Sequence, residues 1–317
     1  MSAGLRSSAP PPPRIGERPR SSVGDRVFYG ATILATLIIV VMLLLILGDA
    51  VIHGAGTITP HFLIDPPSGG MLEGGVGPAA FGTAALTILM TIMVVPVGVI
   101  TAIYLSEYAP PDSRVARAVR LAVANLAGVP SIVFGLFGLG FFVQTIGRGI
   151  DKVGFEGKVT YGQPALIWAA LTLAVLTLPV VIVATEEALR AVPRSLRDAS
   201  LALGASKFQT TFFVVLPQAL GGILTGAILA VSRGAGEVAP ILFTGAAYFL
   251  PDLPSHLNDQ FMNLGYHVYV LATQSPDVDR TKPILYGSVL VLLGLSFALN
   301  LVAVVIRTRS RRAAPGR

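Results

Sequence analysis

Six apolar runs, each long enough to cross a lipid bilayer as a helix, constrain the fold of this chain most strongly. They occupy residues 27–47, 79–105, 121–146, 162–185, 218–250 and 284–306. A membrane-spanning helix needs about 20 mainly apolar residues. Because hydrocarbon offers no partners for backbone polar groups, such runs are expected to be helical. The sequence therefore predicts an all-α membrane protein with six transmembrane helices within residues 27–306.

The composition supports a membrane protein and excludes several kinds of chemistry. Only 13% of the residues are charged, whereas a soluble domain has about 25%. The chain contains no cysteine, which excludes disulfides, thiol catalysis and thiolate metal sites. Residues 1–26 are rich in Ser, Pro and Arg and are predicted to form a disordered tail. Residues 307–317 are predicted to form a basic tail.

The distribution of Lys and Arg predicts how the chain is oriented in the cell membrane. The two tails, with the loops 106–120 and 186–217, carry 17 of these residues, and the three remaining loops carry 5. Cytoplasmic segments of membrane proteins are enriched in Lys and Arg. We therefore expect a multi-pass protein of the cytoplasmic membrane, with both termini and the 186–217 loop in the cytoplasm.

The first half of the 186–217 loop has the pattern of a short helix. Ser195 and Asp198 have the spacing of a capping box, with Asp in place of the usual Glu, so a helix is predicted to begin at Leu196. Gly204 is suited to the left-handed conformation that ends many helices. This half of the loop is thus expected to be a helix followed by a glycine bend.

The second half of the loop has the pattern of another helix. Ser206 and Gln209 repeat the capping-box spacing, which predicts a helix starting at Lys207. Pro217 disfavours helix at Leu216 and is expected to end it. The predicted apolar faces are Leu196, Ala199 and Leu203 on the first helix, and Phe208, Phe212 and Val215 on the second. From this pattern alone, an amphipathic linker resting on lipid is an equally good interpretation.

The residues of this loop also resemble a known motif. Asp198-Ala199-Ser200, then Gly204, then Leu216-Pro217 resembles the EAA loop of ABC-importer permeases, which belong to the binding-protein-dependent transport system inner-membrane components. Asp replaces the family's Glu and Ser replaces its second Ala. The resemblance implies the type I permease fold, with a coupling helix in this loop that docks on a separate ATPase subunit.

Two charged residues interrupt the fifth apolar run. A charge at the bilayer centre costs about 2.5–3.5 kcal/mol on insertion scales. Arg233 and Glu237 are one helical turn apart, but such a pair recovers only about 0.2–0.5 kcal/mol. Gly234, Gly236 and Pro240 predict a distorted or broken helix. The sequence leaves two interpretations open, namely an ion pair that fixes packing, or an anion site or gate on a transport path.

The segment 233–247 resembles the A-type permease subunits of phosphate-specific ABC importers. The resemblance implies uptake of inorganic phosphate together with a paralogous C-type permease, two copies of an ATPase and an external phosphate-binding protein. A permease for sulfate, molybdate or phosphonate is the alternative. A secondary transporter or channel is a further one, although it has no need of a docking loop.

Motifs for catalysis and for cofactor binding are missing from the sequence. The chain lacks the Gly-rich loop that ends in Gly-Lys-Ser/Thr, so it does not bind ATP by that motif. His-Glu-x-x-His and Gly-x-Ser-x-Gly are also missing, and the four histidines lack metal-ligand spacing. We therefore expect a transport subunit without cofactor, metal or nucleic-acid partner, with ATP hydrolysed on another subunit.

Overall fold

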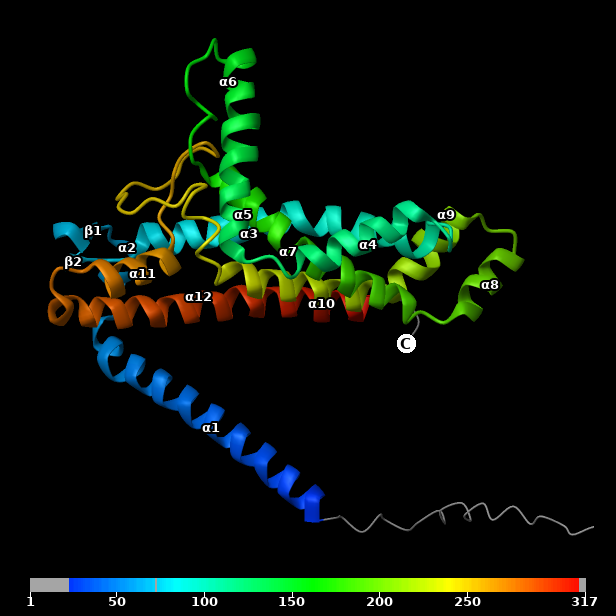
Figure 1. The fold of residues 1–317 in the computed structure, drawn as a ribbon, viewed down its shortest axis with the longest axis horizontal. Coiled ribbons are helices and arrows are strands. Elements are labelled where there is room, and N and C mark those ends of the chain that lie inside the picture. The colour runs from blue at the N-terminus through cyan, green and yellow to red at the C-terminus, as the bar shows by residue number, and fades with distance from the viewer. Residues whose placement is uncertain (1–22, 72, 314–317) are drawn as a thin grey trace, which may run out of the picture. The chain divides into compact units, whose positions relative to one another are not determined.

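The computed structural model describes residues 23–71 and 73–313, which are mainly helical (Figure 1). Most of the predicted N-terminal tail and the last four residues lie outside this described part. The chain divides into two units between Asp49 and Ala50.

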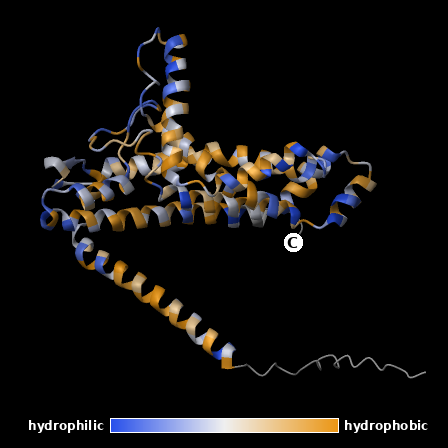
Figure 2. Cartoon of the chain, viewed as in Figure 1, coloured by the Kyte–Doolittle hydropathy of each residue, from blue (hydrophilic) through white to orange (hydrophobic). Residues whose placement is uncertain are grey.

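The first unit contains most of helix α1 (Val23–Gly54). This helix begins four residues before the predicted apolar run. It is apolar along most of its length (Figure 2). A helix that is apolar all round is suited to a lipid environment.

Four long helices lie side by side in the second unit (Figure 1). They are α3 (Gly77–Ile103), α7 (Leu166–Arg190), α10 (Leu216–Ala235) and α12 (Val278–Ala313). The core forms where α3, α7 and α10 meet, around the buried side chains of Leu86, Met90, Leu173 and Ala230. The last described residues of the predicted basic tail continue helix α12 rather than leaving it at residue 306.

Small residues allow α7 and α10 to approach closely. A Cβ atom at Gly222 would collide with the Cβ of Ala188, and one at Gly226 would lie 2.7 Å from the Cβ of Ala184. Close backbone approach at small residues is a common way of packing membrane helices. The Gly222-x-x-x-Gly226 spacing is therefore a helix–helix contact within this chain.

The third apolar run is interrupted, and the spanning helix is displaced along the sequence from the expected 121–146. Its segments are α4 (Arg114–Leu126), α5 (Ser131–Phe137), the π-helical η4 (Gly138–Gly147) and α6 (Arg148–Gly154). Pro130 lies at the start of α5, where it separates α4 from the helix that follows. The helix extends beyond 146 because the carboxylate of Asp151 accepts bonds from the N–H groups of Thr160, Tyr161 and Gly162.

Shorter elements lie at the end of the second unit away from α8 (Figure 1). They are η1 (Ala55–Thr57), α2 (Pro60–Ile64), β1 (Pro67–Ser68), η2 (Gly69–Met71), β2 (Glu73–Gly74) and α11 (Leu264–Gln274). The strands pair antiparallel, with Pro67 opposite Gly74. Phe62, Met71 and Leu264 belong to a second buried cluster that joins this end to α12.

Six helices in the described part are long and apolar enough to cross a membrane. Their ranges are Val23–Thr57, Gly77–Tyr108, Ser131–Gly154, Leu166–Arg190, Lys207–Ala235 and Val278–Arg309. This confirms the predicted number of spans and the all-α class. The fifth helix ends at Ala235, well before the expected residue 250. The break follows Arg233 and Gly234.

Candidate functional site

The loop predicted to be the coupling loop, residues 186–217, begins within the last turn of α7, which ends at Arg190, and then contains a helix of nine residues. Helix α8 runs from Arg194 to Ala202, and Pro193 precedes it without a side-chain cap. The predicted capping box of Ser195 and Asp198 is therefore wrong. Pro193 has the extended backbone from which a helix can begin directly, and this places Ser195 inside the first turn rather than before it.

The end of α8 follows the sequence prediction. Gly204 has a φ of +86°, in the left-handed region. The N–H of Ala205 donates to the carbonyl of Ser200 at 3.2 Å, as in a Schellman motif. Ser206 and Gln209 form the predicted capping box, in which the N–H of Gln209 donates to Ser206 Oγ at 3.2 Å and Gln209 Oε1 accepts the N–H of Ser206 at 2.8 Å. The two bonds fix where the second helix begins.

Pro217 does not end the second helix. Helix α9 (Lys207–Gln209), the π-helical η5 (Thr210–Val215) and α10 follow one another without a break. Proline donates no N–H and crowds the carbonyl four residues before it. The π turns before Pro217 pair backbone groups five residues apart, as from Leu216 to Thr211, so the helix continues through the proline. Leu216 and Pro217 thus lie at the base of α10.

Several apolar side chains on the outer surface of the coupling loop are uncovered in this chain. No residue of α8 is buried, and Leu201 and Leu203 are 48% and 90% exposed. Phe208 stacks on Phe212 with ring centroids 4.4 Å apart, and both side chains are exposed. Val215 does not belong to this ridge, because it is buried against α7. The exposed ridge therefore comprises α8 and the first turns of the second helix.

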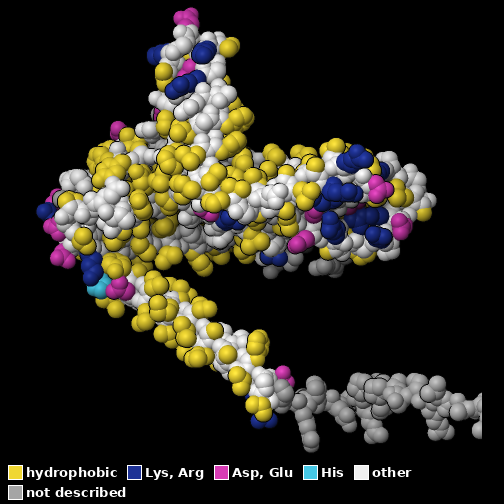
Figure 3. Space-filling model, viewed as in Figure 1, with side chains coloured by type: hydrophobic (Ala, Val, Ile, Leu, Met, Phe, Trp, Pro, Cys, Tyr) yellow, Lys and Arg dark blue, Asp and Glu magenta, His cyan; other side chains and the backbone are white. Residues whose placement is uncertain are grey.

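Charged side chains connect the coupling loop to the rest of the unit. Arg197 of α8 binds both carboxylate oxygens of Glu107, which lies in η3 (Tyr104–Tyr108) at the end of α3. Arg120 of α4 binds Glu186 of α7 at 3.2 Å. Lys and Arg side chains gather at this end of the unit (Figure 3). This basic end is the one that the charge distribution predicts to be cytoplasmic.

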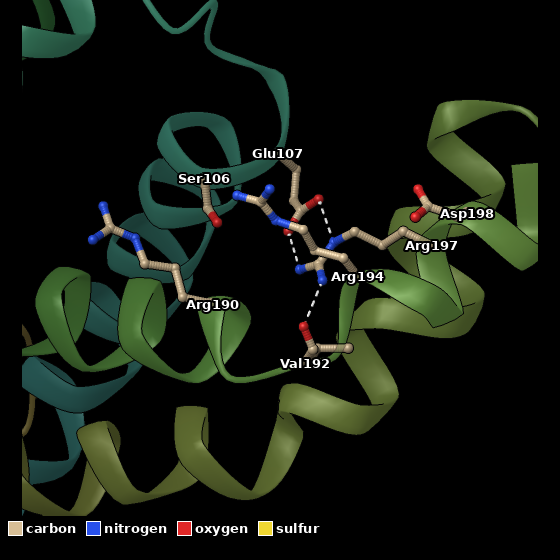
Figure 4. Close-up of a pocket in the computed structure, with 7 residues that line it drawn as sticks. All are labelled: Ser106, Glu107, Arg190, Val192, Arg194, Arg197 and Asp198. Carbon is tan, nitrogen blue, oxygen red and sulfur yellow. Dashed lines mark hydrogen bonds and ion pairs between the residues drawn. The ribbon is translucent and has the colours of Figure 1, made fainter.

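A cavity of about 450 Å³ opens beside the Glu107–Arg197 pair. The residues around it are Ser106, Glu107, Arg190, Val192, Arg194, Arg197 and Asp198 (Figure 4). Within the described part of the chain, Arg194 and Asp198 make no side-chain hydrogen bond or ion pair. Of the motif residues, Asp198 and Ala199 are exposed, whereas Ser200 is half-buried and its hydroxyl contacts that of Thr210 at 2.9 Å. Asp198 is thus available to a partner and Ser200 is already engaged.

Arg233 and Glu237 lie where helix α10 ends. Arg233 occupies the last turn and Gly236 caps the helix, so the break expected from the glycines and Pro240 is present. Arg233 Nε lies 3.6 Å from Glu237 Oε1, a contact that is electrostatic rather than a hydrogen bond. The side chains are 44% and 23% exposed. This chain alone therefore covers neither charge completely.

The break lies at membrane depth. A Cβ at Gly234 would collide with Met90, which is halfway along the spanning helix α3. After the break the chain stays irregular up to α11, but Ile241 and Phe261 are fully buried in the core. Irregular backbone is tolerated at this depth where protein surrounds it. The charged pair therefore marks a broken helix inside the spanning unit.

The family model for the binding-protein-dependent transport system inner membrane component matches residues 94–313, which include the coupling loop and the charged pair. The chain belongs to this family.

Named relatives and a solved structure agree with this assignment. The chain is 34% identical over 222 residues to the probable ABC transporter permease protein YqgI of Bacillus subtilis, covering 70% of each chain. It is 35% identical over 243 residues to the phosphate transport system permease protein PstA 1 of Mycobacterium tuberculosis H37Rv, covering 75% of this chain and 72% of that one. A chain of a bacterial alginate ABC transporter, solved with an alginate pentasaccharide-bound periplasmic protein, has the same fold, with a TM-score of 0.62, 14% identity and coverage of 92% and 99%.

Membership of the transport-system family confirms the resemblance found in the sequence and the permease fold that it implied. It also identifies the chain as a transport subunit and not a catalytic one. The contacts of Glu107, Arg120 and Glu186 cannot be predicted from the sequence. Each lies at the end of an apolar run, where a charged residue is unremarkable, and their partners lie 66 or 90 residues away. Only the fold brings them together.

Proposed function

We propose that this chain is the membrane permease subunit of an ATP-driven importer of inorganic phosphate. The observation that carries the proposal is the 35% identity over 243 residues to a protein named as a phosphate transport system permease. The matched family supports transport that depends on a binding protein. In this assembly an external phosphate-binding protein delivers the anion, a paralogous C-type permease completes the path, and two copies of an ATPase drive it.

The coupling loop is the proposed docking site for one ATPase subunit. Its ridge offers exposed Leu201, Leu203 and Phe208 beside the carboxylate of Asp198, which has no side-chain partner among the described residues. An apolar patch next to an unpaired charge is suited to a protein partner. Ala199 and Gly204 shape the ridge, whereas Ser200, Leu216 and Pro217 fix how it joins α10. An ATPase that docks on this loop lies in the cytoplasm, so the loop and both termini are cytoplasmic in this proposal. Residues 1–26 and 307–317 are then the tails, and residues 27–306 form the transmembrane domain.

The Arg233–Glu237 pair is the proposed anion contact on the transport path. Both side chains are partly exposed on the surface of this chain at membrane depth, a place where a charge is costly unless protein or water covers it. Ser232 Oγ accepts a bond from Asn300 Nδ2 at 3.4 Å beside it, which extends the polar surface onto α12. A polar surface at this depth fits a path shared with the paralogous permease. The guanidinium of Arg233 supplies several donors for a tetrahedral oxyanion.

Uptake by the reconstituted complex tests the proposed function. The chain is co-expressed with the ATPase, the second permease and the binding protein, and is placed in vesicles with ATP on the ATPase side. We expect uptake of radioactive phosphate that requires both ATP and the binding protein. Excess unlabelled phosphate should compete, and the same excess of sulfate or molybdate should not. Uptake of sulfate in preference to phosphate would contradict the phosphate assignment while leaving the permease role intact.

A further inference from the structure

Helix α8 is attached to the rest of the chain without a buried apolar side chain. None of its nine residues is buried. At its far end, Gly204 has a positive φ and no atom within 4 Å of where a Cβ would stand. A connection of this kind bends easily, because no side chain packs around it. Any displacement of α8 must therefore pass to the transmembrane helices through polar contacts or through the backbone at its two ends.

Arg197 provides most of the polar contacts of α8. Its Nη2 donates to Glu107 Oε1 at 2.7 Å and its Nε donates to Glu107 Oε2 at 3.2 Å. The same guanidinium donates to the carbonyls of Leu189 and Val192, both at 2.8 Å. The two charged side chains are only 18% and 11% exposed. A bidentate contact of this type has a defined geometry as well as strength. The side chain of Arg197 thus joins α8 to the ends of α3 and α7 that lie nearest to it.

The element that holds Glu107 is itself held in place. Arg120 of α4 donates to the carbonyl of Leu105 at 2.6 Å, and Leu105 lies in the same π-helical segment as Glu107. Arg120 also pairs with Glu186 near the end of α7. Arg120, in the middle of α4, therefore connects the ends of α3 and α7. A displacement that reaches Glu107 would be shared by all three helices.

We propose that the Glu107–Arg197 pair is the joint through which movement of the coupling helix reaches the transmembrane helices. The proposal rests on the proposed docking of an ATPase at α8. Arg197 and Glu107 are positioning residues, since they act through their contact with each other and through the bond from Arg197 to Leu189 of α7. The competing model is that the backbone at residues 191–193 and 203–206, together with the Ser200–Thr210 contact, transmits the movement without the pair. In that model, loss of the pair changes stability but leaves coupling unchanged.

The reconstituted complex distinguishes the two models by the phosphate transported per ATP hydrolysed. Glu107→Gln and Arg197→Gln should lower this ratio at least tenfold while the complex still contains the ATPase. Arg197→Lys keeps the charge but loses the fork, so it should fall between them and the wild type. Ser106→Ala is the matched control, since Ser106 lines the same cavity from the same π-helical segment as Glu107, outside the docking surface, and its hydroxyl makes no hydrogen bond within residues 23–71 and 73–313. Its ratio should equal that of the wild type.

Rescue by a cross-link separates the joint from a merely structural contact. A charge swap is unsuitable, because Glu at 197 would face the carbonyl oxygens of Leu189 and Val192. The chain has no cysteine, so Glu107→Cys with Arg197→Cys can be joined by a short thiol cross-linker. The ratio should be low before cross-linking and should recover afterwards. Ratios within twofold of wild type in the assembled single variants, or no recovery on cross-linking, would overturn the proposal.

A distance measurement tests the joint independently of the transported substrate. Spin labels at Ser195 and Thr101 report the separation of α8 from α3. In the wild-type complex this separation should stay constant when ATP binds, because the two elements move together. In Arg197→Gln it should change. Lack of phosphate uptake by the wild type would contradict the proposed function, whereas a separation that behaves alike in wild type and variant would contradict only the joint.

Discussion

Arg233 Nε lies 3.6 Å from Oε1 of Glu237, across the residue that caps the end of helix α10. The contact is long and both side chains are partly exposed. An i,i+4 pair with the basic residue first is also the weaker orientation. Glu237 therefore holds Arg233 only loosely, as the proposed exchange of Glu237 for a transported anion requires.

Substitution of Arg233 distinguishes a transport role from a packing role. Arg233→Gln removes both the charge and the fork, so we expect phosphate uptake per assembled complex to fall at least a hundredfold. Arg233→Lys keeps the charge and should retain part of the uptake. Complex assembly, measured by co-purification, should be unchanged in both. A packing role instead predicts loss of assembly in proportion to uptake, with recovery in the double variant Arg233→Gln, Glu237→Gln.

Substitution of Gly204 tests the docking surface. A Cβ there would meet nothing within 4 Å, so any effect comes from its φ of +86°. Gly204→Val places a β-branched residue in the left-handed region, which costs about 1–2 kcal/mol and should displace the ridge. We expect several-fold less ATPase to co-purify. Gly204→Asn is the matched control, because Asn tolerates this conformation, and it should bind the ATPase normally. Equal binding by both variants would show that the bend is unimportant.

Local chemistry made part of the coupling loop predictable from the sequence. The bend at Gly204 and the capping box of Ser206 depend only on residues within one turn, and both are present. The break after Arg233 follows from the glycines and proline around it. The helix end predicted at Pro217 is wrong because the π-helical bonds before Pro217 let the helix continue although proline has no N–H. The sequence around a proline does not show whether the preceding turn will be α-helical or π-helical.

Contacts between distant segments could not be predicted. Glu107 and Arg197 are 90 residues apart, and either could equally well have been a solvated surface charge. The predicted end of the third span, residue 146, is too early. Hydropathy alone does not show that the carboxylate of Asp151 accepts hydrogen bonds from three backbone N–H groups. Apolar length predicts how many helices span the membrane. It does not predict where charged residues can be accommodated at their ends.

The contact between α7 and α10 predicts a clear difference between two identical substitutions. Gly226→Ala places a Cβ 2.7 Å from that of Ala184, and such overpacking costs about 1–3 kcal/mol. Gly294→Ala in α12 is the matched control, because nothing lies within 4 Å of its position. We expect the midpoint of thermal unfolding in detergent to fall for Gly226→Ala and to stay the same or rise for Gly294→Ala. Equal midpoints would contradict the close packing.

Single-cysteine labelling tests the proposed orientation, since the natural chain has no cysteine to mask the result. Ser68 and Ser195 lie at opposite ends of the second unit and both are exposed. Ser68→Cys should react with an impermeant maleimide on intact cells. Ser195→Cys should react only after permeabilisation. Labelling of Ser195→Cys from outside would overturn both the orientation and the docking role.

His267 is the buried titratable group whose protonation should affect stability most directly. It lies in α11, outside the spanning helices, and is 2% exposed. Neither ring nitrogen has a hydrogen-bond partner within the described part of the chain. Burial lowers the pKa of His267 to about 4 from an ordinary value of 6.5. The folded protein therefore holds a neutral imidazole where the unfolded chain would hold a proton.

This difference in pKa predicts that the free energy of unfolding falls as the pH falls from about 6.5 to 4, because the unfolded chain binds the proton first. The loss should total about 3 kcal/mol. His267→Phe cannot be protonated, so the pH dependence of its unfolding midpoint in this range should be weaker than that of the wild type. His61→Gln is the control, since the His61 side chain is 90% exposed, and it should keep the wild-type dependence. Identical profiles for wild type and His267→Phe would show that the imidazole is solvated or bonded in the folded protein.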